Sequence, residues 1–278
     1  MIDLHSHTSA SDGTLSPAEL IEAAAAAQLE ALAITDHDTF SGYDAAVPLA
    51  AEAGIELICG IELSVKWRGR SVHLLGYFFD GGAPEGFRAW ATAMLEARED
   101  RNRRLARELQ AHGVGITLEE VHERSGPLAA RPHFASLLLE KGYVATLQQA
   151  FDEYLGEGAK CYVPRDEPQF DEAARRIAEH GGISSVAHPG RTWSRAEVAA
   201  SQLRSMLPYG LDAIEAWHSD HSPETMEFYK SLARTLGIGV SGGSDFHGAN
   251  KPSIRLGTGR DGKLSVPREV LEDLRALR

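Results

Sequence analysis

Residues 31–38 read ALAITDHD, and this stretch decides the class of fold. Its first five residues form a short apolar run typical of a buried strand, and charged or titratable residues follow at once. Other brief runs predict further strands, most of them followed by polar or small residues. They occupy residues 1–5, 56–59, 72–79, 183–187, 213–216 and 238–240.

Helical patterns fall between these strands. Ser16 is a good helix N-cap, because Pro17 suits the first helical position and Glu19 can complete a capping box. An alanine run at residues 23–27 continues that helix. Strands that alternate with helices favour parallel pairing through βαβ units, so we predict an α/β barrel or a related layered sheet. Such barrels carry their chemistry at the C-terminal ends of the strands.

The middle of the chain has a different pattern, with no convincing strand between residues 84 and 158. Residues 89–112 form one long predicted helix rich in Arg and Glu, and a capping-box pattern at residues 117–120 opens another. Two more helices are predicted at residues 132–141 and 146–155. We therefore expect a barrel built from residues 1–83 and 159–278, with a helical cap domain of residues 84–158 inserted into it.

Composition narrows the class of protein. The chain has 278 residues, 43% of them hydrophobic and 24% charged, which suits one folded α/β barrel with an insertion. No apolar run approaches the roughly 20 residues that span a membrane, and the first residues lack the pattern of a secretory signal. Two cysteines imply no disulfide framework. These features predict a cytoplasmic protein without a membrane partner.

Charge limits the partners. The chain carries 28 Lys and Arg against 40 Asp and Glu, which gives a net charge of −12. This charge argues against a protein that coats DNA or another long polyanion, because the two would repel each other. A small anionic substrate stays compatible with this balance, because bound metal ions can reverse the field inside a site.

Histidines and carboxylates follow nearly every predicted strand. His5 and His7 are two residues apart, so their side chains point to the same side and can reach one ion. Asp245 and His247 repeat that spacing after another strand. Taken singly, each such residue has an ordinary explanation as a solvated or core side chain. Their recurrence predicts a metal site, and the candidate ligands are His5, His7, Asp12, His37, Glu62, His73, His188, Asp245 and His247.

Imidazole and carboxylate ligands suit borderline divalent ions such as Mn²⁺, Zn²⁺ or Fe²⁺, and the absence of a thiolate argues against a structural zinc site. Nine groups can supply two ions, or three if a carboxylate bridges them. We expect two to three divalent ions per chain, with manganese favoured over zinc or iron.

The motifs HSHTSASDGT, TDHDT, GIE, VHLLGY, AHPGR and GSDFHG resemble, in order, those of the PHP family, named for polymerase and histidinol phosphatase. The resemblance implies a distorted (β/α)7 barrel with up to three metals. It also implies that Glu62 bridges two of the ions. The implied ligand sets are His5, His7, Glu62 and Asp245 for one ion, Glu62, His73 and His188 for a second, and Asp12, His37 and His247 for a third.

A narrower resemblance rests on residues 131–134, RPHF, and on the helical insertion. It is to the bacterial 3′,5′-nucleoside bisphosphate phosphatases, also described as trimming the 5′ ends of short RNA. The implied reaction removes the 3′-phosphate and leaves the 5′-monophosphate, by attack of a metal-bound hydroxide. Asp245 is the candidate for accepting the proton of the attacking water. His188 or His247 is the candidate for protonating the leaving alkoxide.

Several basic residues are candidates for binding the substrate, because Arg and Lys suit phosphate contacts. Arg131, His133, Lys160 and Arg191 are the favoured ones, and Arg165 is a weaker candidate. The remaining histidines show no strong pattern and are predicted to lie at the surface. They are His112, His122, His180, His218 and His221.

Other functions remain open from the sequence alone. A histidinol phosphate phosphatase or another small-molecule phosphomonoesterase would use the same metal motifs, but the amine of histidinol phosphate would need an acidic receptor in the insertion. A non-catalytic metal- or nucleotide-binding module would carry the fold without turnover. A metal-dependent amidohydrolase fits the ligands but not the basic residues. The sequence does not determine the native metal, the oligomeric state, or the choice between a free nucleotide and an RNA end.

Overall fold

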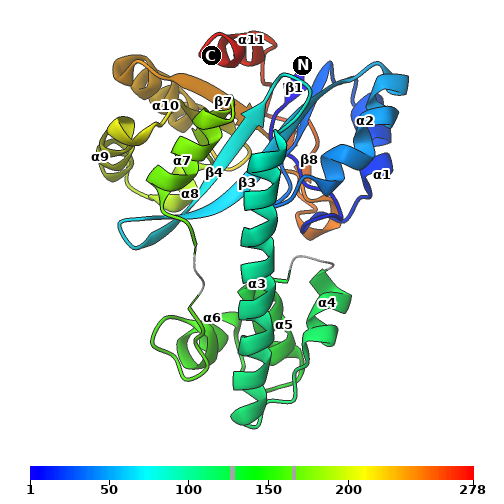
Figure 1. The fold of residues 1–278 in the computed structure, drawn as a ribbon, viewed down its shortest axis with the longest axis vertical. Helices are drawn as coiled ribbons and strands as arrows, with labels where there is room; N and C mark the ends of the chain where they lie inside the picture. The colour runs from blue at the N-terminus through cyan, green and yellow to red at the C-terminus, as the bar shows by residue number, and fades with distance from the viewer. Residues whose placement is uncertain (126–128, 165–166) are drawn as a thin grey trace. The chain divides into compact units, whose positions relative to one another are not determined.

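The computed structural model describes residues 1–125, 129–164 and 167–278 (Figure 1). The chain forms two compact units, which are described separately here. The first comprises Met1–Ala91 and Glu167–Arg278, and the second comprises Thr92–Asp166. Arg165, a weaker candidate for binding substrate, lies outside the described residues.

The first unit is an α/β fold with a nearly closed seven-stranded barrel, counted over the described residues. Its strands follow one another around the sheet in chain order, and the last returns to the first, where Leu4 N donates to Gly242 O at 3.1 Å. The strands are β1 (Ile2–Asp3), β2 (Ala31–Ile34), β3 (Glu56–Trp67), β4 (Arg70–Phe78), β5 (Ile183–Val186), β6 (Ala213–His218) and β7 (Gly239–Gly243). The predicted fold class is confirmed.

The prediction of parallel pairing is wrong for β4, which runs antiparallel to both β3 and β5. Arg68 and Gly69 join β3 to β4 directly, with φ angles of 49° and 80°. Positive φ at both central residues is the geometry of a type I′ turn, which links two antiparallel strands without a crossover helix. As a result β3 extends to Trp67, and Glu62 lies inside this strand instead of after its end.

The helices of the first unit cover the barrel. Ser16 caps α1 (Pro17–Ala26) as predicted, since its hydroxyl accepts from Glu19 N at 3.3 Å and the Glu19 carboxylate accepts from Ser16 N at 2.8 Å. The other elements of this unit are α2 (Ser41–Ala53), α7 (Phe170–Glu179), α8 (Pro189–Thr192), α9 (Ala196–Met206), η2 (Leu207–Tyr209), α10 (Pro223–Leu236), η3 (Gly248–Asn250), β8 (Ile254–Arg255), β9 (Gly259–Arg260) and α11 (Glu269–Arg275).

Burial of apolar side chains holds the barrel together. Phe170 and Ile177 on α7 are fully buried in the cluster that packs against β3 and β4. Tyr77 on β4 is buried as well, and its hydroxyl donates to Leu4 O at 2.9 Å. This hydrogen bond ties β4 to the residue that follows β1 and precedes His5 in the chain.

The second unit contains only helices and turns within the residues that the structure describes. The long helix α3 (Glu85–Ala111) enters it from the first unit. It is followed by α4 (Leu118–Ser125), α5 (Arg131–Glu140), α6 (Leu147–Ala150) and the π-helical turn η1 (Phe151–Leu155). The predicted capping box is present, because Glu120 N donates to Thr117 Oγ1 and Thr117 N donates to the Glu120 carboxylate. Phe134 and Leu138 lie in a separate apolar core.

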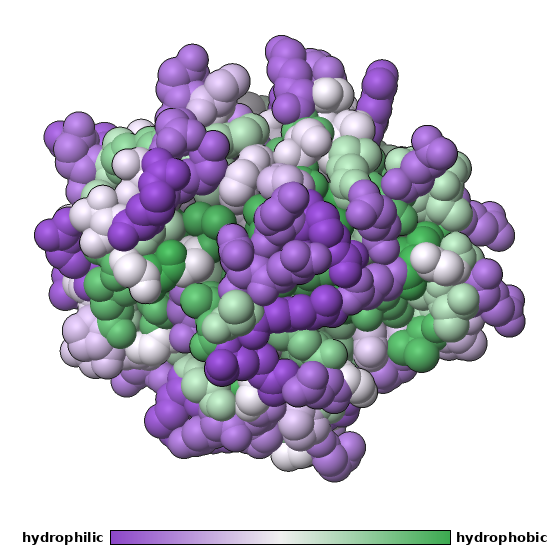
Figure 2. Space-filling view, turned by 90° about the horizontal axis from the view of Figure 1, so that it is seen from above, coloured by the Kyte–Doolittle hydropathy of each residue, from purple (hydrophilic) through white to green (hydrophobic). Residues whose placement is uncertain are grey.

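Hydrophilic and apolar side chains are mixed on the face that carries α11 and both termini, with many of the hydrophilic ones projecting outward (Figure 2). On α11 and just before it, Arg275 and Arg268 pair with Glu56 at the start of β3. Cys59 and Cys161 are buried free thiols. Across the described residues, no helix is both long and apolar enough to cross a membrane.

Candidate metal centre

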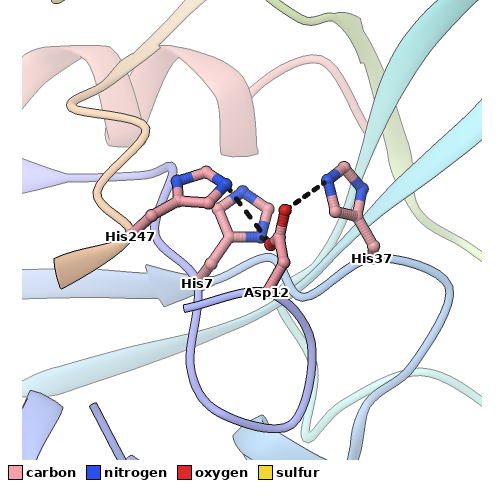
Figure 3. Close-up of side chains that lie close together, drawn as sticks. All are labelled: His7, Asp12, His37 and His247. Atoms are coloured by element: carbon pink, nitrogen blue, oxygen red, sulfur yellow. Dashed lines mark ion pairs between the residues drawn. The ribbon is translucent and has the colours of Figure 1, made fainter. Parts of the chain in front are cut away.

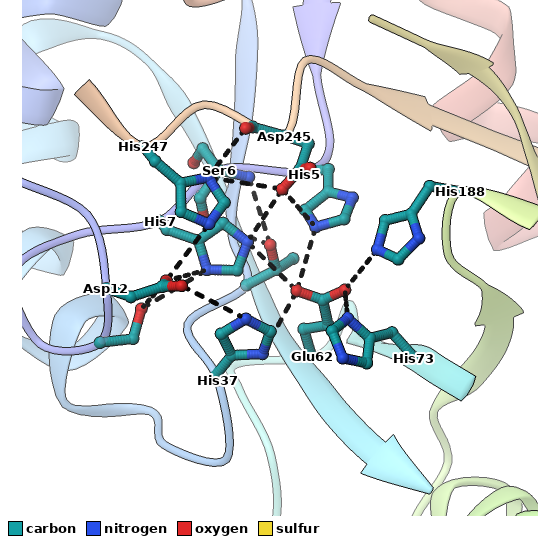
Figure 4. Close-up of polar contacts among 12 residues, drawn as sticks. His5, Ser6, His7, Asp12, His37, Glu62, His73, His188, Asp245 and His247 are labelled. Carbon is teal, nitrogen blue, oxygen red and sulfur yellow. Dashed lines mark hydrogen bonds and ion pairs between the residues drawn. The ribbon is translucent and has the colours of Figure 1, made fainter. Parts of the chain in front are cut away.

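Histidine and carboxylate side chains meet at one end of the barrel (Figure 4). Most are supplied by the segments that follow parallel strands, as expected of a barrel site. His5 and His7 follow β1, His37 follows β2, His188 follows β5, and Asp245 and His247 follow β7. Glu62 and His73 come instead from within the β3–β4 hairpin, where Ser64 pairs with His73. An isolated parallel bridge between His37 and Glu62 brings the hairpin beside the segment after β2.

Within the described chain, three groups of these residues have their ligand atoms within 4.8 Å of one another. They are His7, Asp12, His37 and His247 (Figure 3), then His5, His7, Glu62 and Asp245, and finally His37, Glu62 and His73. The second group has the same members as one ligand set implied by the family resemblance. The other two differ from the implied sets, because His7 joins the first and His37 takes the place of His188 in the third.

Glu62 is the shared residue of this centre. Its side chain is 1% exposed. Glu62 Oε1 lies 2.8 Å from His73 Nδ1 and 3.0 Å from His188 Nε2. Its other oxygen, Oε2, faces a further set of imidazole nitrogens at 3.2–3.3 Å, namely His5 Nε2, His7 Nε2 and His37 Nδ1. The two oxygens thus face different histidines, which is the arrangement that a bridging carboxylate requires.

The side chains fit bound cations. In the described part of the chain, several buried imidazole nitrogens have no hydrogen-bond partner, namely His5 Nε2, His7 Nε2, His37 Nδ1 and His188 Nδ1. A buried polar atom without a partner is costly, whereas a metal ion would use these lone pairs. The donors are imidazole nitrogen and carboxylate oxygen, which suit borderline divalent ions. The buried clusters are therefore consistent with several metal sites.

Burial and charge divide the histidines into two classes. Burial lowers the pKa of His37 to about 3 and that of His188 to about 4, so both are neutral at neutral pH. Burial would also lower the pKa of His7, but contacts with Asp245 and Glu62 outweigh it and raise the pKa to about 9. The pKa of His5 is raised well above its ordinary value, since nearby carboxylates outweigh its burial. His5 and His7 are thus protonated at pH 7.5 before a metal binds.

Metal loading at pH 7.5 should therefore release about two protons per chain, one from His5 and one from His7. Because the raised pKa of His7 is about 9, metal affinity should fall as the pH drops below that value and level off above it. Titration calorimetry with Mn²⁺ in buffers of different ionisation enthalpy measures the protons released. Metal uptake without proton release would contradict this assignment.

Glu215 on β6 is a part of the centre that sequence reasoning missed. It is fully buried, and its Oε1 lies 2.8 Å from His5 Nδ1. Its Oε2 accepts a hydrogen bond from His188 N at 2.6 Å. A carboxylate at Nδ1 fixes the proton there and directs the Nε2 lone pair of His5 toward the centre. The sequence contained one sign of this role, namely an acidic residue inside the apolar run at residues 213–217, AIEAW.

Replacing Glu215 with glutamine should lower metal affinity by about 10- to 100-fold, because the amide offers one acceptor oxygen where the carboxylate serves two donors. Calorimetric titration of the metal-free variant with Mn²⁺ measures the change. Glu227→Gln, at an exposed position on α10, is the matched control and should bind like the wild type. Unchanged affinity in Glu215→Gln would show that His5 keeps its orientation without this carboxylate.

Asp36 anchors the loop that carries the first ligands, and sequence reasoning assigned it no role. Its carboxylate accepts from Thr8 N at 2.8 Å, from Thr8 Oγ1 at 2.7 Å and from Ser11 Oγ at 2.5 Å. Helix α2 begins close against it, because a Cβ on Gly42 would lie 2.0 Å from Asp36 Oδ2. These contacts hold in place the loop between His7 and Asp12.

The prediction that His218 and His221 lie at the surface is wrong, because both are buried. His218 ends β6, and its Nε2 lies 3.4 Å from Asp245 Oδ2. His221 Nδ1 bonds to Ala216 O at 2.9 Å. His218 ends a strand and His188 follows one. The expectation that titratable residues at strand ends point into the site therefore applied to His218 as well as to His188. His112 is exposed, and His122 and His180 are partly buried.

The basic residues predicted to contact substrate fall into different units. Arg191 is beside the centre, with Nη1 2.9 Å from Asp245 Oδ2. Arg131, His133 and Lys160 belong to the second unit. There Lys160 Nζ lies 3.6 Å from the ring centre of Tyr154, and His133 Nδ1 accepts from the backbone N–H of residue 130. Only Arg191 of the four is thus placed in the unit that carries the metal ligands.

Known proteins are similar to this chain in fold and in sequence. The PHP domain family model matches residues 3–186. The 5′-3′ exoribonuclease Rnm of Salmonella typhimurium is 35% identical over 92% of this chain and 87% of its own. The 3′,5′-nucleoside bisphosphate phosphatase of Chromobacterium violaceum is 32% identical over 94% of this chain and 92% of its own. A solved structure from Bifidobacterium adolescentis, described as a metal-dependent phosphoesterase, has a TM-score of 0.79 and 30% identity, covering 99% of this chain and 96% of its own.

The nearly closed barrel and the buried histidine and carboxylate cluster define the class, that of metal-dependent phosphoesterases. With the family model matching well over half of its length, the chain belongs to the PHP family. The predicted enzyme class is confirmed.

Proposed function

We propose that this protein removes the 3′-phosphate from nucleoside 3′,5′-bisphosphates, giving the 5′-monophosphate, and also trims short RNA from its 5′ end. The gathering of the nine predicted ligand side chains, Glu62 among them, at one centre carries the proposal, because these imidazoles and carboxylates could hold ions that hydrolyse a phosphoester. Relatives named for both activities, each about one-third identical over most of the chain, support the choice of substrate.

The nine side chains would hold two to three divalent ions, with manganese as the first candidate and zinc or iron as alternatives. Bound ions would lower the pKa of a coordinated water to about 7 and polarise the phosphoryl oxygens. Three ions bring a charge of about +6, and Asp12, Glu62 and Asp245 offset −3 of it. The buried Glu215 carboxylate beside His5 offsets one more charge. The remaining charge of about +2 would attract a phosphate in spite of the acidic surface.

The chain's own residues would then complete the reaction. Asp245 is proposed to accept the proton of the attacking water, since its Oδ1 faces His5 and His7 at 3.5 Å within the centre. His188 or His247 is proposed to protonate the leaving alkoxide with the proton that the attacking water releases, because burial lowers the pKa of both imidazoles and keeps them neutral beforehand. His247 Nδ1 is held by Asp245 O at 2.8 Å, which leaves its Nε2 facing the centre.

Substrate selection is proposed to come from Arg191 at the centre, from Arg131 and His133 in the helical insertion, and from Lys160 just after it. Two phosphates call for two groups of cations, and guanidinium groups suit bidentate phosphate contacts. We propose that residues 84–158 form a cap domain that confers this selectivity. The substrate is thus a small phosphorylated nucleotide or a short RNA end.

The test is phosphate release by the Mn²⁺-loaded protein from adenosine 3′,5′-bisphosphate, with AMP and histidinol phosphate as comparison substrates. A short 5′-phosphorylated RNA is assayed beside them for released mononucleotides. Rapid release from the bisphosphate alone supports the proposal. Preference for histidinol phosphate would replace it with the amino-acid phosphatase function, and inactivity of the metal-loaded protein on all substrates would favour a non-catalytic module.

A further inference from the structure

The carboxylate of Asp245 has two different environments on its two oxygens. Oδ1 faces the metal-ligating imidazoles, with His5 Nε2 and His7 Nε2 each at 3.5 Å. Oδ2 points to the other side, where Lys251 Nζ lies at 2.6 Å and Arg191 Nη1 at 2.9 Å. One edge of the centre is therefore lined by two cations that are not metal ligands.

These cations are in excess over the acids around them. Asp220 Oδ2 lies 3.7 Å from Arg191 Nε, but the same carboxylate is already bonded to Arg260 at 2.7 Å. Among these side chains Arg191, Lys251 and Arg260 contribute +3, while Asp220 and Asp245 contribute −2, so the sum is +1. A metal ion bound at Asp245 Oδ1 would neutralise part of that carboxylate's charge and so make the sum more positive. The edge is thus suited to an anion.

The cations are also reachable from solvent. The side chain of Asp245 is 4% exposed, whereas that of Arg191 is 45% exposed and that of Lys251 is 29% exposed. A phosphate in solvent can therefore reach the ammonium and guanidinium groups, whereas the Asp245 carboxylate is almost fully shielded from solvent.

The segment that carries Lys251 is fixed to the metal-binding loop. It follows η3, where Ala249 N donates to Thr14 Oγ1 at 2.8 Å and Asn250 Nδ2 donates to Asp12 O at 2.8 Å. Because Asp12 belongs to one of the metal-ligand groups, the position of Lys251 is tied to the position of the ions. A positioned cation gains more from a bound anion than a freely moving one does.

We propose that Lys251, together with Arg191, forms a phosphate-binding subsite at the Asp245 edge of the metal centre. Its ligand is the dianionic phosphate of a phosphomonoester, bound through its non-bridging oxygens. The Lys251 ammonium acts as a point charge, and the Arg191 guanidinium supplies directed donors. The subsite extends the proposed function, on which it rests, by adding Lys251 as a residue that binds the phosphate undergoing hydrolysis.

The test uses Lys251→Met, which keeps most of the length of the side chain and removes its charge, and Lys251→Arg, which keeps the charge. Lys263→Met is the matched control, because Lys263 is a highly exposed lysine in the same C-terminal region. Inorganic phosphate is titrated into each Mn²⁺-loaded protein by calorimetry, and bound manganese is measured by elemental analysis. KM and kcat for the bisphosphate are measured alongside.

In Lys251→Met, the Kd for inorganic phosphate and the KM should both rise by on the order of tenfold to a hundredfold, with manganese content unchanged. Lys251→Arg should stay close to the wild type, as should Lys263→Met. A Kd within about twofold of the wild-type value overturns the subsite. Loss of manganese from Lys251→Met also overturns it, by showing that the lysine only holds Asp245.

The experiment can disprove the proposed function without disproving the phosphate-binding subsite. If the wild type hydrolyses no nucleotide bisphosphate but its phosphate affinity still depends on Lys251, the substrate assignment is wrong and the subsite stands.

Discussion

Replacing Glu62 with glutamine should lower kcat/KM for phosphoester hydrolysis by on the order of a thousandfold or more. The carboxylate faces His73 and His188 through Oε1 and three further imidazoles through Oε2, so it is shared between two of the ligand groups. An amide has one acceptor oxygen and no charge, and it cannot bridge two cations. We expect the variant to hold at most one tightly bound ion.

The measurement pairs steady-state kinetics with elemental analysis of the purified variant. Glu52→Gln is the matched control, because Glu52 is exposed on α2, and it should keep both activity and metal content. Circular dichroism separates loss of the centre from loss of the fold. Retention of the full metal content together with near wild-type activity would falsify the bridging role of Glu62.

The sequence predicted the site through residues at the ends of strands. His5, His37, His188 and Asp245 follow short apolar runs, and the C-terminal ends of parallel strands meet at one end of a barrel. Their convergence could therefore be expected without any knowledge of distances. Glu62 is also among the predicted ligands, although the predicted strand at residues 56–59 ends before it.

What the sequence could not show is how strands and partners far apart in the chain are paired. The turn at Arg68 and Gly69 makes an antiparallel hairpin, and an arginine with positive φ gives little signal in a sequence. Glu215 bonds to His5 across 210 residues, and its role appears only when β6 lies beside the centre. Lys251 follows a 3₁₀ turn whose position depends on contacts with the Asp12 loop. Such contacts arise from tertiary packing and not from local pattern.

Substitution of Gly243 should have the second large effect, because this residue links closure of the barrel to the geometry of the centre. The residue ends β7, and a Cβ placed on it would lie 2.3 Å from His5 N and 2.4 Å from His5 Cβ. These atoms belong to the chain segment that closes the barrel, where Asp245 N donates to His5 O at 2.9 Å. A methyl group fits there only if the junction between β1 and β7 opens and moves a metal ligand.

Gly243→Ala should therefore lower the free energy of unfolding by about 3 kcal/mol, the upper end of the usual cost of overpacking. It should also reduce kcat/KM by on the order of a hundredfold, since a displacement of about 1 Å at a reacting centre has an effect of that size. Chemical denaturation and steady-state kinetics measure the two effects.

Gly115→Ala is the matched control. A Cβ there would meet only the Tyr143 hydroxyl, at 3.4 Å, at the end of a side chain that can move. Its free energy of unfolding should change by no more than about 0.5 kcal/mol. If Gly243→Ala were destabilised but bound manganese and turned over substrate normally, barrel closure and ligand placement would be independent. If both properties decline together, the close approach of β7 to His5 is what places the first metal ligand.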